Sequence, residues 1–374
     1  MKKGWRVLVI ILIVLLTVGL TPKAAQAEQI EALGVTAVHR NGQTFITWTE
    51  SAGLTNELYT IYRSNEPITA ANIHQARALL TVPEDSARFY ANRYYKDYVG
   101  PWLNRYLDRL VIADGQPQLA AGTGLLVWTL NEYDFQDYPE MAGYYAVTYT
   151  PYGGSEIFDA ANVTGRVSES LLPPKPVRTA VNLGGNAYLM IQYMDLHSWN
   201  PTFHAPNSTN NYYGYNPNDF KIRHAVQYAY DYAISTPTAT QCDGSVPPVV
   251  PVVMHLHSWG DNTYDPYLPG QAPDWCATII WPIDMGETWF FGFAQENDYR
   301  ISEMPGPGDV IQNYTEQRLL RMIYDQLHNP VGPEIDPERI YVKGASMGAN
   351  GALALALRYP DVFAAAYSSQ PMTN

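Results

Sequence analysis

The sequence predicts two folded modules in tandem, an all-β sandwich followed by an α/β domain with a mostly parallel sheet. Short alternating runs separated by turn residues fill residues 31–170, as in β-sandwiches. Beyond residue 178, longer apolar runs alternate with helical segments, which is typical of a sheet buried on both faces. A proline-rich connector at residues 171–177 separates the two patterns. A chain of 374 residues is also long for a single core.

Residues 1–27 have the pattern of a secretory signal peptide. Three basic residues precede a long apolar run, and the small residues Ala25 and Ala27 offer a cleavage site before Glu28. An uncleaved membrane anchor is the alternative, because the apolar run is not far short of a span. Cleavage predicts a protein that is secreted or held in the cell envelope, with no stable membrane span.

The first strands of the sandwich are the clearest. The segment VTAVHRNGQTFITWTE contains two alternating runs joined at Asn41-Gly42, which is the strongest short signal for a hairpin. Together with Trp48 on the second strand and a tyrosine-rich strand at Tyr144–Tyr149, this order resembles a fibronectin type III domain. The resemblance implies an all-β module over residues 31–170.

One segment does not suit such a module. Residues 86–113 place Tyr90, Tyr94 and Tyr98 four positions apart, which predicts a helical insertion. The chain has 29 tyrosines in all, and the aromatic front half could grip a polymeric substrate. Aromatic packing inside the core is the commoner reason for such richness.

The α/β domain is predicted over residues 178–374. Its helical segments are NYTEQRLLRMIYDQL and the alanine-rich stretch that follows Ser346. Its expected strands are AYLMIQYMDL, VQYAYDYAIS, PVVMHLHSWG, TIIWPI, RIYVKG and VFAAAYSS.

Two cysteines flank one of these strands. Export would place Cys242 and Cys276 in an oxidising compartment, so we expect a disulfide between them. Closing a loop of this length contributes roughly 3–4 kcal/mol to stability. Two unpaired buried thiols are the alternative. Structural zinc is not expected, because it takes four ligands.

A sharp turn carries the strongest chemical signal. The strand RIYV is followed by Gly344-Ala345-Ser346-Met347-Gly348 and then at once by a helix. A strand–turn–helix of this kind presents a nucleophilic serine at strained backbone angles, and its neighbours must be small. A close-packed joint without chemistry is one alternative. A dinucleotide-binding loop is another, but it needs glycine where Ser346 stands.

These residues resemble the α/β-hydrolase superfamily, most of all secreted esterases of the polyhydroxybutyrate depolymerase and feruloyl esterase type. The segment DPERIYVKGASMGANGALALALRYPDVFAAAYSSQP carries the resemblance. It implies that Ser346 is the nucleophile, that no cofactor is needed and that the substrate is a carboxylic ester, including polymeric ones. Prolyl oligopeptidase-like peptidases share the lead-in, so a serine peptidase remains an alternative.

The oxyanion donors also follow from the resemblance. The superfamily supplies one backbone N–H after the nucleophile and one from the loop after the third strand. The resemblance assigns these to Met347 and Trp259. Relatives carry His-Gly where this chain has His257-Ser258, so the second donor is left open between positions 258 and 259.

A metal site is a rival interpretation of the histidines. His255 and His257 lie two apart on a strand and so share one face, and His197 and His204 lie elsewhere in the chain. A strand histidine is more often satisfied by a hydrogen bond, and no metal is expected. The net charge of −13 also argues against nucleic-acid binding, which needs clustered basic residues.

The triad partners are missing from the expected positions. In the superfamily the acid and then the histidine follow the serine. No histidine follows Ser346, and Asp361 is the one carboxylate that does. We therefore expect an incomplete α/β domain, truncated before the acid and histidine strands and inactive or weak by itself. A non-catalytic binding protein with a degenerate hydrolase domain is the remaining alternative, and the sequence does not predict an oligomeric state.

Overall fold

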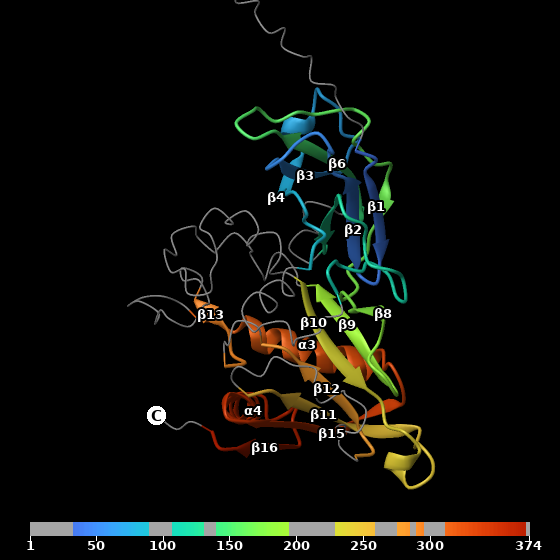
Figure 1. Cartoon of the computed structure of the whole chain (residues 1–374), viewed down its shortest axis with the longest axis vertical. Coiled ribbons are helices and arrows are strands. Elements are labelled where there is room, and N and C mark those ends of the chain that lie inside the picture. The colour runs from blue at the N-terminus through green and yellow to red at the C-terminus, as the bar shows by residue number, and fades with distance from the viewer. Residues whose placement is uncertain are drawn as a thin grey trace, which may run out of the picture. The chain divides into compact units, whose positions relative to one another are not determined.

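The computed structural model describes residues 33–89, 107–130, 140–193, 229–258, 275–284, 289–294 and 311–371 (Figure 1). The expected signal peptide and its cleavage site lie outside the described residues. No helix in these described ranges is long and apolar enough to cross a membrane.

The described residues between 33 and 168 form two antiparallel sheets. One has the strand order β1-β2-β5 and the other the order β4-β3-β6-β7. The predicted hairpin joins β1 to β2 through Asn41 and Gly42, whose φ angles of 53° and 74° are the two positive values that a type I′ turn requires. The strands are β1 (Thr36–Arg40), β2 (Gln43–Thr49), β3 (Leu58–Ser64), β4 (Arg77–Pro83), β5 (Thr123–Trp128), β6 (Ala142–Thr150) and β7 (Val167–Ser168).

The core of these sheets is aromatic. Trp48, Tyr59, Tyr145 and Tyr149 are all buried in one apolar cluster. Alternate residues of β3 contribute to it, as the two-residue period of a strand requires. Core packing therefore accounts for three of the tyrosines that the sequence left open to a role in gripping polymer.

The predicted helical insertion is wrong at its two described ends. Residues 86–89 and 107–113 run antiparallel to each other, with a bridge between Arg88 and Arg109. Backbone hydrogen bonds join Phe89 to Asp108 and Leu110 to Ala87. The four-residue tyrosine spacing predicted a helix, but Phe89 and Leu110 turn into a buried cluster as extended chain. Tyr90, Tyr94 and Tyr98 lie outside the described residues.

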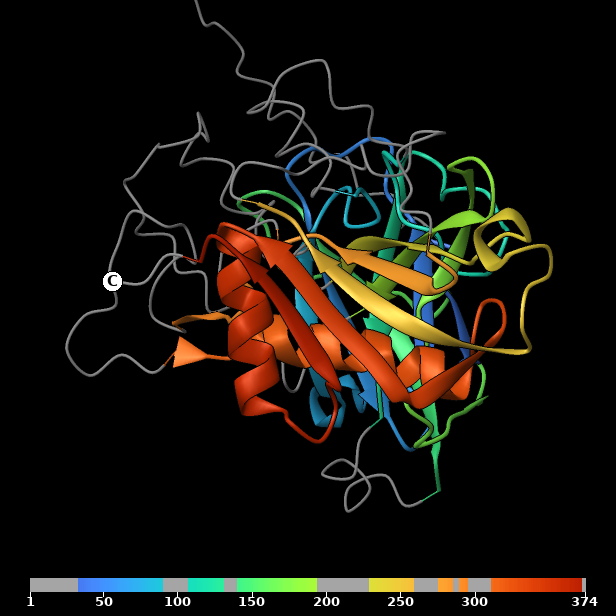
Figure 2. The ribbon, with the colours of Figure 1, turned by 90° about the horizontal axis from the view of Figure 1, so that it is seen from below.

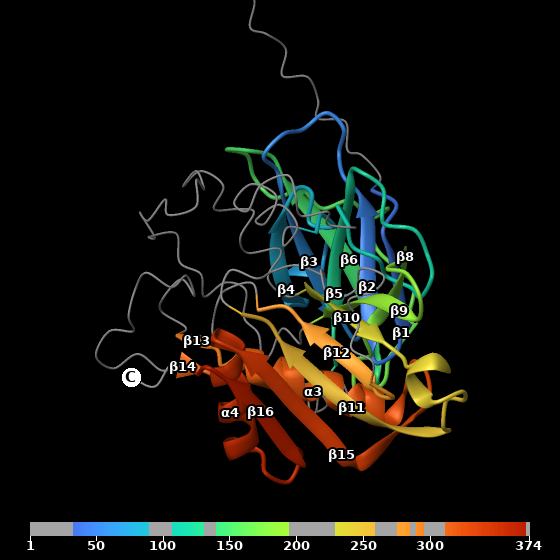
Figure 3. The same ribbon diagram turned by 60° about the horizontal axis from the view of Figure 1, so that its bottom comes forward.

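The second half is built on a seven-stranded sheet with the order β16-β15-β11-β12-β10-β9-β8 (Figure 3). Because β12 lies between β10 and β11, the chain crosses over between these strands. The elements are β8 (Val177–Asn182), β9 (Ala187–Tyr193), β10 (Ala229–Ser235), β11 (Val249–Leu256), β12 (Thr278–Pro282), α3 (Tyr314–His328), β15 (Glu334–Ala345), α4 (Met347–Arg358) and β16 (Ala365–Ser369), with a small pair, β13 (Phe293–Ala294) and β14 (Ile311–Gln312), beside them.

The sheet is less parallel than the sequence predicts. The four strands β12, β11, β15 and β16 are parallel, whereas β8, β9 and β10 pair antiparallel. Burial on both faces makes β9 and β10 as apolar as the parallel strands, and an apolar run carries no information on strand direction.

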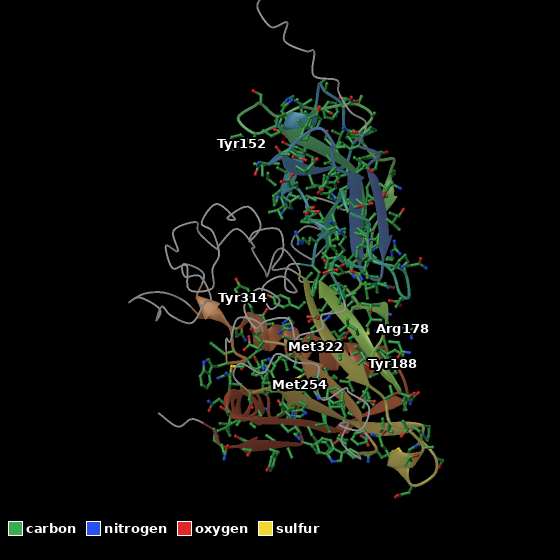
Figure 4. All side chains as sticks on the ribbon, in the orientation of Figure 1. Tyr152, Arg178, Tyr188, Met254, Tyr314 and Met322 are labelled. Carbon is green, nitrogen blue, oxygen red and sulfur yellow. A yellow bond between two sulfur atoms is a disulfide. The ribbon has the colours of Figure 1, made fainter. Side chains whose placement is uncertain are left out.

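Two helices cover one face of the sheet. Residues of α3 and α4 share a buried cluster with Val252, Met254 and Val342 of the sheet. Figure 4 labels Met254 on β11 and Met322 on α3, both members of this cluster. Figure 2 shows β15 and β16 side by side with α4 next to them. The junction between β15 and α4 is therefore held by a packed layer.

The predicted disulfide is present. Cys242 and Cys276 are bonded, with their Cα atoms 4.8 Å apart. The bond ties a short 3-10 helix, Thr240–Cys242, to the residues that lead into β12. No free thiol is left in the chain.

Candidate active site

Ser346 lies between the carboxyl end of β15 and the first residue of α4. Its φ of 53° and ψ of −117° place it in a region of backbone space that a residue with a side chain rarely adopts. Holding such a conformation costs on the order of 1–3 kcal/mol and marks functional turns. Its side chain makes no cap hydrogen bond to the helix, and the residue is half-buried. The hydroxyl thus lies on a strained turn and does not cap the helix.

The glycines that flank this turn are required by close approaches of the backbone. A Cβ on Gly344 would overlap the carbonyl oxygen of Gly348 and lie 2.8 Å from its Cα. A Cβ on Gly348 would overlap the carbonyl oxygen of Leu256 and lie 2.6 Å from that of His257. The small residues that the sequence singled out therefore let the turn, the helix and the end of β11 meet.

Met347 offers a backbone donor beside Ser346. It is the first residue of α4, so its N–H has no acceptor within the helix. The helix dipole adds partial positive charge at this end. The buried Met347 side chain belongs to the cluster under the sheet, which fixes the direction of the peptide group. This is the environment that a developing oxyanion needs.

The loop after β11 reaches the turn through Ser258. The Ser258 hydroxyl donates a hydrogen bond of 3.2 Å to the carbonyl oxygen of Ala345, the residue before Ser346. The sequence left the oxyanion donor open between positions 258 and 259. Trp259 lies outside the described residues, so Ser258 is the member of this pair that the structure places.

His257 is a neutral structural histidine. The Asp284 backbone N–H donates to its Nε2 at 2.9 Å, so Nε2 carries no proton. The ring's Nδ1 lies 2.8 Å from the Ser258 carbonyl oxygen, which can only accept, so the proton is on Nδ1. The ring also packs edge-on against Phe290, with the centroids 5.0 Å apart. Both nitrogens are engaged, so His257 has no free lone pair for Ser346 or for a metal.

One ring nitrogen of His255 is also engaged. The Trp281 indole N–H donates to its Nδ1 at 3.2 Å. Among the described residues, no group of three or more histidine, cysteine, aspartate or glutamate side chains could hold a metal ion. His197 and His204 lie outside the described part of the chain. The rival metal interpretation gains no support from the two strand histidines.

The structure adds two serines that the sequence did not single out. The backbone N–H of Ser346 donates to the carbonyl oxygen of Ser369 at 3.0 Å. The Ser368 hydroxyl donates to the Ala349 carbonyl oxygen at 3.0 Å. Both lie at the end of β16, which the parallel register places beside the turn. No local motif announces this role, because it depends on the pairing of distant strands.

The remaining triad groups are not assembled around the hydroxyl. Within the described ranges, no histidine is hydrogen-bonded to Ser346, and both His257 nitrogens have other partners. Asp361 follows α4, away from its first turn, as the sequence predicts. The described residues therefore include the turn that carries Ser346 and the N–H of Met347, and no proton acceptor beside Ser346 is among them.

No protein-family model matches the chain, and no curated protein matches it. Solved structures do. A fluorophosphonate-binding serine hydrolase F of Staphylococcus aureus, substrate bound, is 14% identical over 38% of this chain and 52% of its own, with a TM-score of 0.27. A thermostable esterase is 12% identical over 90% of this chain and 76% of its own, at 0.27. An S-formylglutathione hydrolase of Agrobacterium tumefaciens is 12% identical over 51% and 60%, at 0.29.

The structural neighbours are thus esterases and other serine hydrolases. The match spans about half the length of the Staphylococcus aureus hydrolase. With TM-scores below 0.3, these likenesses leave the reaction to be inferred from the site itself.

Proposed function

We propose that this chain carries the nucleophile of a serine hydrolase that cleaves carboxylic esters through an acyl-enzyme on Ser346. The proposal depends on the backbone conformation of Ser346, which has a positive φ between a parallel strand and a helix. This conformation is energetically unfavourable for a residue with a side chain, and such strain is found mainly at functional turns. Gly344 and Gly348 permit that conformation, because a side chain at either position would overlap the neighbouring backbone.

The reaction would proceed by acyl transfer. The Ser346 oxygen forms a bond to the ester carbonyl carbon, and the carbonyl oxygen becomes an oxyanion that accepts hydrogen bonds from Met347 N–H and from the loop after β11. The C–O bond to the alcohol then breaks, and the alcohol leaves with the proton taken from Ser346. Water repeats the sequence and releases the acid. The resemblance places the second donor at Trp259 or Ser258, and it places the acid and then the histidine after Ser346 in the chain order.

We also propose the domain organisation and location that the sequence indicates. Residues 1–27 would direct export, residues 31–170 would form a fibronectin type III-like module, and residues 178–374 would form the catalytic domain. The sheets of three and four antiparallel strands support the second point. The Cys242–Cys276 disulfide supports an oxidising compartment.

Active-site labelling tests the nucleophile. We expect a fluorophosphonate probe to label the full-length protein and Ser346→Ala to abolish labelling. Ser235→Ala is the matched control, because Ser235 lies in the same sheet on β10, three strands away from β15, and pairs with Ile279 near the amino end of β12. Equal labelling of the wild type and Ser346→Ala would place the reactive group elsewhere.

Substrate class is decided by a second assay. We expect the rate of p-nitrophenyl ester hydrolysis to fall by at least about 10³-fold in Ser346→Ala. The remaining rate would be the part that the oxyanion donors provide without the nucleophile. Peptide anilides should not be cleaved. Cleavage of anilides with esters untouched would favour the peptidase alternative.

A further inference from the structure

The peptide group that precedes the nucleophile is held at both ends. Its carbonyl oxygen, on Ala345, accepts the hydrogen bond from the Ser258 hydroxyl. Its N–H, on Ser346, donates to the Ser369 carbonyl oxygen. One partner comes from the loop after β11 and the other from the end of β16, the strands on either side of β15. The plane of this peptide group is therefore fixed between two neighbours.

This plane sets the backbone angle of the nucleophile. Rotation about the N–Cα bond of Ser346 is measured from the 345–346 peptide group, which is itself rigid. At a φ of 53°, relaxation toward ordinary negative values would tilt that group and break one of its two hydrogen bonds. The two bonds together oppose the strain of the turn.

We propose that Ser258 is a positioning residue, whose hydroxyl holds the Ala345–Ser346 peptide group and thereby keeps Ser346 in its reactive conformation. The catalytic part of this assignment rests on the proposed function. A serine hydroxyl has one proton to donate, and here it goes to Ala345. Ser258 therefore acts on the nucleophile turn and not as a side-chain donor to the oxyanion.

A chain of hydrogen bonds through His257 holds Ser258 in place. The Ser258 carbonyl oxygen accepts the Nδ1 proton of His257, and His257 Nε2 accepts the Asp284 N–H. The Asp284 carboxylate in turn accepts the N–H of Phe290 at 2.9 Å. The neutral imidazole thus connects the loop after β11 to the end of β12. A residue tied in this way can resist movement of the turn.

Substitution of Ser258 in the full-length protein tests the assignment. We expect Ser258→Ala to slow fluorophosphonate labelling and to lower kcat about five- to tenfold, as the loss of one neutral hydrogen bond would. KM should stay unchanged, because substrate contacts remain. Ser258→Thr keeps the hydroxyl and should lie within about twofold of the wild type. Ser235→Ala again serves as the control.

A second measurement does not depend on catalysis. Hydrogen–deuterium exchange at the Ser346 amide should become about five- to tenfold faster in Ser258→Ala, because the peptide group loses one of its two partners. In Ser258→Thr it should stay near the wild-type rate. This readout keeps the test valid if the proposed reaction is wrong.

Three results would overturn the assignment. The first is unchanged exchange at Ser346 in Ser258→Ala. The second is equal loss of labelling in the alanine and threonine variants, which would show that the hydroxyl is not the cause. The third is a rise in KM with kcat unchanged. Failure of Ser346→Ala to abolish labelling would contradict the proposed function instead, while the exchange result would still decide the role of Ser258.

Discussion

Gly348 shows how closely the chain approaches itself beside Ser346. An added Cβ would meet the carbonyl oxygens of Leu256 and His257, which belong to rigid backbone. The same contact places the loop after β11 against the first turn of α4. A single methyl group on Gly348 would therefore push apart the two segments that lie on either side of Ser346.

We expect Gly348→Ala to destabilise the fold by about 1–3 kcal/mol, as overpacking in a tight site does. Labelling of Ser346 should fall with it. Gly165→Ala is the matched control, because a Cβ there meets nothing within 4 Å. Thermal unfolding of both variants checks the prediction, and equal melting temperatures would contradict the described contact.

The residues of the turn could be predicted from the sequence, whereas the hydrogen bonds that hold the turn could not. Gly344, Ser346 and Gly348 could be assigned because strand, turn and helix are adjacent in the chain. The Ser258 hydrogen bond could not, because it joins residues 87 positions apart. The protonation of His257 depends on Asp284, which a strand pattern does not indicate.

At the scale of elements, α3 and α4 are joined by a buried carboxylate. Glu316 is fully buried on α3, and its Oε1 accepts from Arg358 Nε at 2.8 Å. Its other oxygen accepts from Tyr359 and Asn313. Arg358 also lies over the Phe291 ring, 4.6 Å from its centroid. This contact sets the position of α4, whose first turn carries the proposed oxyanion donor.

We expect Arg358→Ala to cost about 3 kcal/mol, because it leaves the buried Glu316 carboxylate without its counter-charge. Glu316→Gln should cost less, about 1–2 kcal/mol, because the exposed side of Arg358 can reach water. Arg339→Ala, which breaks an ion pair with Asp336 at the surface, should cost under about 1 kcal/mol. Urea titrations rank the three, and equal costs would contradict a buried junction.

Element types were predictable where local signals are strong. The Asn41-Gly42 hairpin, the two long helices and the strand before Ser346 all follow from turn chemistry and periodicity. The strand at Arg77–Pro83 was not expected, and the residues around Phe89 were assigned to a helix. The antiparallel direction of β8, β9 and β10 was not predicted either, because strand direction depends on which strands pair and not on the sequence of each strand.

Across the whole molecule, buried carboxyl groups give stability a definite pH dependence. Burial raises the pKa of Glu50 from 4.5 to about 7, although Asp85 N–H donates to its carboxylate. Burial likewise raises the pKa of Asp325 from 3.8 to about 6, with Arg321 and Lys175 opposing the shift. At a pH between the unfolded and the folded pKa, each of these carboxyl groups is protonated in the folded state and ionised in the unfolded state.

The sign follows from proton linkage. Between about pH 4 and pH 7 Glu50 and Asp325 hold protons in the folded state that the unfolded chain has released, so these two groups make the free energy of unfolding fall as pH rises. The net charge of −13 acts in the same direction through self-repulsion. Burial lowers the pKa of His39, which acts in the opposite direction. We expect the double variant Glu50→Gln, Asp325→Asn to flatten this decline by about 2 kcal/mol in total, after allowing for solvent screening.

Unfolding titrations at pH 5 and pH 8 measure the effect. The wild type should be less stable at pH 8 than at pH 5, and the double variant should lose less stability than the wild type between the two conditions. An equal change in stability between pH 5 and pH 8 for the wild type and the double variant would show that these carboxyl groups are not held protonated. Asp336 provides the contrast, since its neighbour Arg339 lowers its pKa.

The alternation along β15 has a consequence for how this gene can change. Ile340 and Val342 face the cluster under α3 and α4, whereas Tyr341 packs against the cluster on the other face. Inserting or deleting one codon within this strand would exchange the two sets and turn Ser346 away from Met347 and Ser258. Natural variation in length should therefore be absent between residues 340 and 346, and should accumulate in exposed connections such as residues 243–248.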